Sequence, residues 1–270
     1  LTVPDISGYV GGDTMGCVLA TGLYDAKEPT LMVDIGTNGE MVLAANGRMA
    51  ACSTAAGPAL EGAKIRCGMR GAAGAIDHVK LENGKLRCSV IGGGKPKGIC
   101  GSGLIDAVAV MLETGAINRR GRVQTAEKCP EFGDRLTEEN GERMFRLAGE
   151  VSICQTDIRE VQLAKGAIAA GIQMLAERLG LEIQDIRTVL LAGAFGSFIN
   201  PDSACAINLI PDALRGRIRA VGNAAGSGAK MTACSSSVLA RAGALIPRIE
   251  FLELASLPDF QHNFVTWMGF

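Results

Sequence analysis

The sequence predicts an α/β protein in which helices flank a mixed sheet and an inserted α+β subdomain interrupts the chain. A strand pattern at residues 31–36 is followed at once by strands at 39–45 and 47–52, as in an antiparallel meander. A long amphipathic helix begins near residue 156, and a second apolar strand follows it and runs into Gly193. This alternation indicates one sheet covered by helices.

Composition excludes several classes of protein. Apolar residues make up 47% of the 270 residues and charged residues 20%, which is typical of a globular protein with a sizeable core. The net charge is −1, so nucleic acid and acidic membranes are poor partners. No stretch reaches the roughly 18 apolar residues of a membrane-spanning helix.

The cysteines predict a reduced, cytoplasmic protein. The nine cysteines are scattered and form no CxxC pair, so neither a zinc ribbon nor an iron–sulfur ligand run is present. With only two histidines in the chain, a Cys–His nucleophile pair has little support. A chain that begins with Leu1 lacks a normal translation start, and we expect it to be a piece of a longer protein.

The first elements follow from helical spacing and from turn residues. Small and apolar residues predict a helix over 13–23, with Asp13 as its N-cap and Gly22 near its end. The meander begins with a strand that is apolar on both faces. Its strands are predicted to be joined by Asn-Gly turns at 38–39 and 46–47.

Residues 53–155 have a mixed pattern. A hairpin is predicted from strands at 76–82 and 85–91 around Asn83-Gly84. A glycine-rich segment leads into a helix over 102–114, and the polar residues 119–142 indicate an excursion over the surface. We expect these residues to form the inserted subdomain.

The last part of the chain contains the longest helix. Asp157 and Glu160 predict a capping box at its start, and Gly180 the turn after its end. After the strand that runs into Gly193, a second helix is predicted near 225–243 and a last strand over "RIEFLEL". The expected organisation is therefore one lobe, with a connecting helix (1–24), a meander (25–52), an insert (53–155) and a closing part (156–270).

The segment "DIGTNGE" is the first candidate for chemistry. Its strand ends on Asp34 and turns through Gly36, Thr37, Asn38 and Gly39, so backbone N–H groups and one hydroxyl could bind a phosphate. Asp34 could hold Mg²⁺ through water, because magnesium keeps much of its hydration shell. A hairpin whose Asp caps its own turn explains the same residues equally well.

The second candidate is "VLLAGAFGSF", residues 189–198. Gly193, Ala194 and Gly196 leave room for a flat group to lie on the backbone, although a strand–helix junction that needs a positive φ explains them more simply. "GGGKPKG" and "GSGAKMT" each depart from a Walker A motif. Cys52 and Cys100 could be reactive at helix N-termini, but buried inert thiols are the preferred interpretation.

The order of these pieces resembles the second lobe of the ATPases that include actin, sugar kinases and heat-shock chaperones, which have an actin-like, ribonuclease H-like fold. The resemblance implies that "DIGTNGE" is the second phosphate loop and "LLAGAFG" the adenosine motif. Asp13 then stands where these ATPases orient the attacking water. These ATPases bind nucleotide between two lobes, and the first lobe has its own Asp-Gly-Thr loop. No such loop precedes Asp34, so the chain resembles one of the two lobes.

Longer strings resemble one branch more narrowly. They are "GYVGGDTMGCVLATGL", "VDIGTNGEMVL", "ACSTAAGPALEGAKIRCGMRGAAGAI", "GICGSGLIDAVA", "DIREVQLAKGAIAAGI" and "LAGAFGSFINPDSACAINLIPD". Together they cover nearly the whole chain and are similar to the C-terminal ATPase-type domain of reductive activators of corrinoid proteins. That resemblance implies ATP and Mg²⁺ as cofactors and an iron–sulfur cluster in an upstream domain. It also implies a cobalamin-type corrinoid protein of methyl transfer as the partner, reduced from Co(II) to Co(I), and a homodimer.

Three alternatives stay open. A small-molecule kinase of the same fold class would need a substrate aspartate between two complete lobes. An ATP-dependent activator of a radical dehydratase would hold its cluster through cysteines in the nucleotide-binding subunit, and the scattered cysteines argue against it. A nucleotide-free domain that docks a partner would keep the fold without the chemistry.

Overall fold

The computed structural model describes residues 2–270, with the side chain of Ala194 left out. Contacts divide the chain into two compact units. The first unit comprises Leu1–Ala55, Ile168–Phe198 and Pro211–Phe264, and the second comprises Ala56–Ala167, Ile199–Ile210 and Val265–Phe270. Each unit is described separately below.

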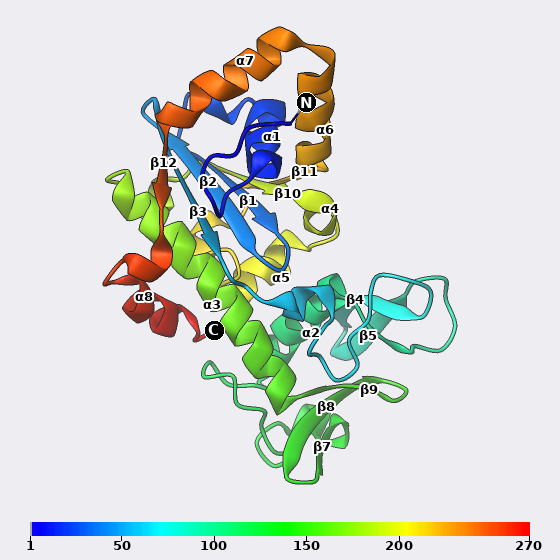
Figure 1. The fold of residues 1–270 in the computed structure, drawn as a ribbon. Coiled ribbons are helices and arrows are strands. Elements are labelled where there is room, and N and C mark those ends of the chain that lie inside the picture. The colour runs from blue at the N-terminus through cyan, green and yellow to red at the C-terminus, as the bar shows by residue number, and fades with distance from the viewer. Residues whose placement is uncertain (1) are drawn as a thin grey trace. The chain divides into compact units, whose positions relative to one another are not determined.

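A six-stranded mixed sheet forms the centre of the first unit (Figure 1). Its strands lie in the order β11-β10-β1-β2-β3-β12. Strands β1, β2 and β3 form the antiparallel meander, while β10 pairs parallel to β1 and β12 pairs parallel to β3. The bounds are β1 Thr30–Ile35, β2 Gly39–Ala45, β3 Arg48–Thr54, β10 Thr188–Ala192, β11 Ile218–Gly222 and β12 Ile249–Leu252.

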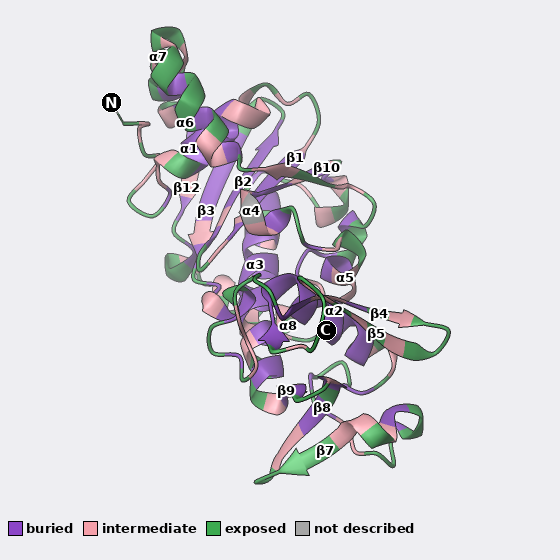
Figure 2. Cartoon of the chain, turned by 90° about the vertical axis from the view of Figure 1, so that its right-hand side faces the viewer, coloured by how far each residue is buried: buried purple, intermediate pink, exposed green. Residues whose placement is uncertain are grey.

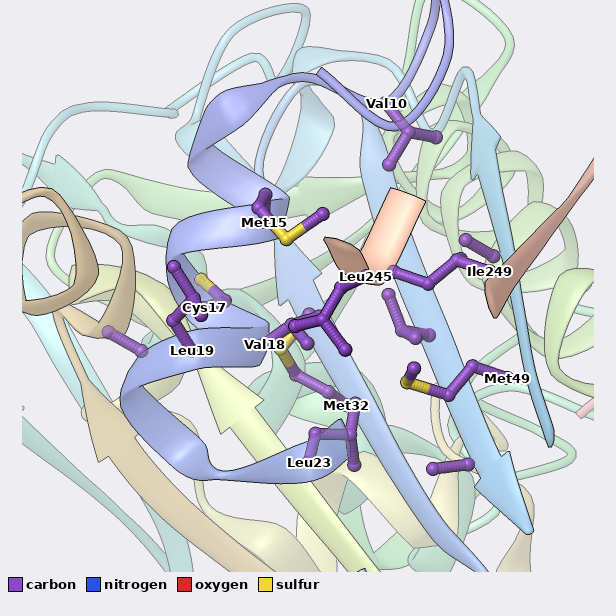
Figure 3. Packing of buried hydrophobic residues seen from close by; sticks show 14 of the residues in the cluster. Val10, Met15, Cys17, Val18, Leu19, Leu23, Met32, Met49, Leu245 and Ile249 are labelled. Atoms are coloured by element: carbon purple, nitrogen blue, oxygen red, sulfur yellow. The ribbon is translucent and has the colours of Figure 1, made fainter. Parts of the chain in front are cut away.

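Helix α1, Gly12–Thr21, packs its apolar side on this sheet (Figure 3). Met15, Val18 and Leu19 contact core residues that include Met32 of β1 and Met49 of β3. The other helices of this unit are α4 Gly193–Gly196, α6 Ala224–Cys234 and α7 Ser236–Leu245, while α3 Gln155–Arg178 and α8 Phe260–Trp267 contribute residues to both units. The core of the first unit therefore lies between α1 and the meander.

Helices α1 and α6 approach each other at two glycines. A Cβ atom at Gly228 would lie 2.0 Å from the carbonyl oxygen of Gly16, and one at Gly16 would lie 2.9 Å from the carbonyl oxygen of Ala225. No real side chain tolerates a contact of 2.0 Å, so the absence of Cβ atoms sets the distance between the two backbones.

The second unit contains two three-stranded sheets and two helices of its own. One sheet has the order β5-β4-β6, with β4 Ala75–Glu82, β5 Lys85–Val90 and β6 Gly98–Ile99. The other has the order β7-β8-β9, with β7 Leu136–Glu139, β8 Glu142–Ala148 and β9 Val151–Cys154. The helices are α2 Gly101–Glu113 and α5 Pro201–Ala206. Helix α2 is almost entirely buried, whereas β7 is largely exposed (Figure 2).

Short 3₁₀ turns connect these elements. They lie at Leu23–Asp25, Pro58–Glu61, Pro130–Arg135, Ile183–Asp185, Asp212–Leu214, Ile246–Arg248 and Leu254–Ser256. No helix within residues 2–270 combines the length and the apolar character needed to cross a membrane.

Several local expectations are confirmed. Asn83 and Gly84 have φ values of 52° and 72° at the β4–β5 turn, as a two-residue Asn-Gly hairpin requires. Gly22 ends α1 in the left-handed conformation, and Gly180, with φ 72°, follows the end of α3. The last strand also forms, as β12.

Two capping predictions are wrong. Gly11 is the N-cap of α1, and Asp13 lies inside the first turn, while the carboxylate of Asp5 accepts the N–H of Gly12 at 2.8 Å. Asp157 likewise lies inside α3, and there it accepts the N–H groups of Cys154 at 2.9 Å and Arg66 at 2.8 Å. Asp5 therefore contributes to the start of α1, and Asp157 bonds a residue far away in the sequence as well as its own helix.

Two boundaries also differ from expectation. The Asn38-Gly39 turn is wrong, because Gly39 already pairs with Ile35 and the loop is Gly36–Asn38. The helix expected over 225–243 is two helices, separated at Ser235, whose side chain accepts the N–H of Val238 and starts α7. Strand β11 and helix α8 were not predicted from the sequence.

Candidate functional site

Asp34 stands near the carboxyl end of β1, between a parallel and an antiparallel neighbour. It lies opposite Ala192 of β10 and opposite Glu40 of β2. The residues before it, Met32 and Val33, are fully buried and anchor the strand in the sheet. The loop that follows is tight, because the N–H of Gly36 donates to the carbonyl of Asn38 at 2.9 Å. The carboxylate therefore has a fixed position at the sheet edge where ligands of α/β proteins bind.

The structure brings Gly193 directly against Asp34. Gly193 has φ 83°, and a Cβ atom there would lie 2.4 Å from Oδ1 of Asp34. Both the backbone conformation and the available space therefore require glycine. Gly196, the last residue of α4, packs against the preceding strand β10 instead, since a Cβ atom there would lie 3.3 Å from the backbone carbon of Leu191. Ala194 belongs to α4, and its side chain lies outside the described part of the structure.

Helix α1 contributes Asp13 and Cys17 to the same region. The thiol of Cys17 points at Oδ2 of Asp34 across 3.8 Å. Burial, and then the charge of Asp34, raises the pKa of Cys17 to about 12, so this thiol stays protonated. Asp13 accepts the N–H of Thr14 at 2.8 Å. A cavity of about 680 Å³, lined by the first residues of the chain and the starts of α1 and α6, opens beside Asp13.

Glu40 is a member of this cluster that the sequence reasoning did not select. It faces Asp34 across the β1–β2 pair, and the hydroxyl of Ser53 donates to its carboxylate at 3.3 Å. Burial, and then the charge of Asp13, raises the pKa of Glu40. The predicted Asn38-Gly39 turn hid this pairing, because its register would place Leu43 opposite Asp34. The observed loop Gly36–Asn38 places Glu40 there instead.

Three carboxylates from α1, β1 and β2 thus repel one another in a partly desolvated site. Burial is also the main cause that raises the pKa of Asp34, and the charge of Asp13 adds to it, while the Cys17 thiol opposes the rise. Like charges directly opposite on paired strands destabilise a sheet. A cation held between these groups would relieve both effects.

The donors of this cluster are carboxylate oxygens, the ligand type that magnesium prefers. Within residues 2–270, no three His, Cys, Asp or Glu side chains are arranged to hold a metal ion among themselves. Magnesium usually takes one or two carboxylates and keeps several waters, with phosphate oxygens completing its shell. The residues present therefore fit Mg²⁺ bound through water together with a phosphate.

Cys52 and Cys100 are buried, as the preferred interpretation of the sequence expected. Cys52 lies in β3, and burial strongly raises the pKa of its thiol. Cys100 precedes α2, and its sulfur lies 3.5 Å from the carbonyl oxygen of Ile76. All nine cysteines are free thiols.

Comparisons with known proteins identify the family of this chain. Residues 28–270 match the family model described as the C-terminal domain of RACo, the ASKHA domain. The corrinoid activation enzyme RamQ of Eubacterium limosum is 40% identical over 97% of this chain and 46% of its own length. The [Co(II) methylated amine-specific corrinoid protein] reductase of Methanosarcina barkeri is 30% identical over 77% of this chain and 39% of its own length.

A solved structure is similar along the whole chain. It is a reductive activator for corrinoid, iron–sulfur protein, with a TM-score of 0.87 and 35% identity over 99% of this chain and 44% of that one. The match confirms the predicted actin-like α/β fold. The chain spans less than half the length of each of these relatives.

Proposed function

The chain belongs to the family of C-terminal ASKHA domains of RACo, and from this we propose that it is the ATP-binding domain of a reductive activator. In the complete protein, ATP is coupled to an electron transfer that returns a Co(II) corrinoid protein to Co(I). An ASKHA domain implies nucleotide binding. The names of the relatives, which describe corrinoid activation and reduction, support the rest.

The observation that carries the proposal is the meeting of Asp34 and Gly193, which come from the two motifs singled out in the sequence. The Gly193 backbone lies so close to Oδ1 of Asp34 that no side chain fits between them. The loop Gly36–Asn38 and Gly39 would bind phosphate through backbone N–H groups and the hydroxyl of Thr37. The backbone of Gly193, Ala194 and Gly196 would seat the adenosine.

Asp34 and Asp13 would have different roles in nucleotide binding and hydrolysis. Asp34 would hold Mg²⁺ through water, because it is the carboxylate fixed beside the phosphate loop. Asp13, at the start of α1, would orient a water molecule for attack on the terminal phosphate. A bound metal ion would supply the positive charge that neutralises the phosphates and these acids.

A nucleotide can drive an uphill electron transfer only if it binds two states of the complex with different affinity. We assign these states to the opening and closing of a two-lobed clamp, of which this chain is one lobe. The iron–sulfur cluster that supplies the electron belongs to a part of the protein upstream of this chain, as in the family that the sequence resembles. The partner is the corrinoid protein, and the active form is a homodimer.

Calorimetric titration of the full-length protein with Mg-ATP tests the nucleotide site. Asp34→Asn and Thr37→Ala should each weaken binding by roughly tenfold or more, because each removes a group aimed at the phosphates or the metal. Gly193→Ala should do the same through the clash at 2.4 Å. Gly243→Ala, on an open face of α7, is the matched control and should bind normally.

Unchanged affinity in both Thr37→Ala and Gly193→Ala would overturn the assignment. Failure of the wild-type protein to bind Mg-ATP at all would favour a nucleotide-free docking domain. Phosphorylation of a sugar or acid by the intact protein would favour a kinase.

A further inference from the structure

Positive charge is concentrated in one part of the second unit. Residues 64–97 contain eight lysines and arginines but only two acids, whereas the net charge of the whole chain is −1. Six of these cations are exposed and, among the described residues, have no ion-pair partner. We call them the basic face: Arg70, Lys80, Lys85, Arg87, Lys95 and Lys97.

Two cations of the basic face occupy an electrostatically unfavourable position in the sheet. Lys80 and Arg87 are directly opposite on the β4–β5 hairpin, where like charges destabilise the pair. Strand β5 is an edge strand, and lysine on an edge discourages pairing with other chains. Edge protection explains Lys85 and Arg87, but it does not explain Lys80 on the inner strand or the lysines of the loop.

The loop 91–97 holds one of its cations in a fixed position. The N–H of Lys97 donates to the carbonyl of Gly74 at 2.8 Å. A Cβ atom at Gly74, which has φ 95°, would lie 2.9 Å from Cδ of Lys97, so the lysine stem rests on a glycine backbone. The "GGGKPKG" segment, which fits no phosphate-loop motif, therefore presents Lys97 from a defined site.

A cavity of about 490 Å³ lies beside β5. Its charged lining consists of three cations, Arg87, Arg135 and Arg146, and one acid, Asp134. Arg135 donates through Nη1 to the carbonyls of Arg146 at 3.1 Å and Leu147 at 2.8 Å. Arg146 donates through Nη2 to the carbonyl of Asp134 at 3.0 Å. These guanidinium groups are held by neutral carbonyls, so their positive charge is not cancelled by a bonded carboxylate.

We propose that the basic face and this arginine-lined cavity form a docking surface for an acidic segment of a protein partner. The proposal rests on the proposed function, because an activator must bind and then release the protein that it reduces. Complementary charge raises the rate of encounter without requiring a tight complex. The cavity is large enough to admit carboxylate side chains of the partner.

The composition of the segment favours protein over other anionic partners. Residues 64–97 contain no Phe, Tyr or Trp, which single-stranded nucleic acids use for stacking. The segment also lacks large apolar side chains exposed for insertion into a membrane interface.

Fluorescence anisotropy with the full-length protein and a labelled deca-glutamate peptide tests the proposal. Binding should weaken roughly tenfold in the double variant Lys80→Glu/Arg87→Glu at low salt, and wild-type binding should weaken steeply as salt rises. A second double variant, Lys85→Glu/Lys95→Glu, changes only exposed side chains at the hairpin tip and in the loop. The matched control Lys128→Glu/Lys230→Glu changes charge equally elsewhere and should lose less than twofold.

Equal loss in the control and in both basic-face variants would overturn the proposal, since net charge alone would then explain binding. Tighter binding of a 20-base-pair DNA duplex or of phosphatidylserine vesicles than of the peptide would also overturn it. Mg-ATP titration of the same variants should match the wild type. The docking proposal can therefore fail while the nucleotide site stands.

Discussion

Lys165 provides a direct test of how burying a titratable amine changes the pH dependence of stability. It lies on α3 in the second unit and is completely buried. Its ammonium group donates to the carbonyl of Gly269 and lies 5.0 Å above the ring of Phe270. It has no carboxylate partner in the part of the chain that the structure describes. Burial lowers the pKa of Lys165 from 10.5 to about 7.

The sign of the pH effect follows from this shift. Between pH 7 and pH 10.5 the unfolded chain keeps a proton on Lys165 that the folded chain has lost, so the free energy of unfolding rises with pH. Below pH 7 both states are protonated and this contribution no longer changes. From pH 7.0 to pH 8.5 the expected gain is about 1.6 kcal/mol, at 1.36 kcal/mol per pKa unit and half-titration at the lower end.

Urea unfolding at pH 7.0 and 8.5, followed by circular dichroism, measures this gain. Lys165→Met keeps an unbranched side chain of similar length but cannot titrate, so its unfolding free energy should change less over the interval than that of the wild type. Keeping the window below pH 9 avoids most of the opposite effect of cysteines such as Cys154, whose pKa burial raises to about 12. Lys165→Arg should stay charged, unfold more easily at both pH values and also lose the slope.

Equal pH slopes in wild type and Lys165→Met would refute the reasoning. That result would mean that the buried amine stays protonated in the folded state, so that its carbonyl and aromatic contacts offset the desolvation.

Three further predictions concern the rest of the chain. Gly228→Ala should lower the free energy of unfolding in urea by at least about 1–3 kcal/mol, because its Cβ would lie 2.0 Å from the Gly16 carbonyl oxygen. Gly243→Ala, where a Cβ meets no atom, should raise it by about 0.5–1 kcal/mol. Glu40→Gln should stabilise the nucleotide-free protein at pH 7, because burial raises the pKa of this acid and its charge is unfavourable without a cation. The same variant should bind Mg-ATP more weakly. Equal stability of the variant and the wild type would contradict this prediction. Asp157→Ala should cost about 2–4 kcal/mol, because the backbone N–H groups of Cys154 and Arg66 lose their acceptor; Asp157→Asn keeps an acceptor and should cost less.

Local chemistry explains which parts of the fold the sequence could predict. The meander, the Asn83-Gly84 hairpin and the end of α1 at Gly22 depend on apolar alternation and on left-handed turn residues, and both are visible in a few neighbouring positions. Asp34 and Gly193 were each selected as candidate site residues from local sequence patterns of this kind. Their contact did not, because it depends on β10 pairing parallel to β1 after a long separation in the sequence.

The errors have a shared physical cause. Asp5 accepts the N–H of Gly12 at the start of α1, where Asp13 accepts only the N–H of Thr14. Asp157 serves Arg66 as well as its own helix. In each case the start of the helix includes a hydrogen bond to a residue that local spacing does not identify. The break at Ser235 was hidden because three consecutive serines allow either a continuous helix or a new N-cap, and tertiary packing decides between them.

The electrostatics of the two units point to opposite kinds of ligand. In the first unit, strand pairing forces Asp34 against Glu40, and burial raises the pKa of both carboxylates. In the second unit, strand pairing places Lys80 opposite Arg87, and neither has an ion-pair partner among the described residues. Each arrangement lowers the stability of the isolated fold, and neither is needed to form its sheet. A hydrated cation with phosphate would remove the first penalty, and an acidic protein segment would remove the second. A variant that neutralises either pair should therefore gain stability alone and lose affinity for one ligand only.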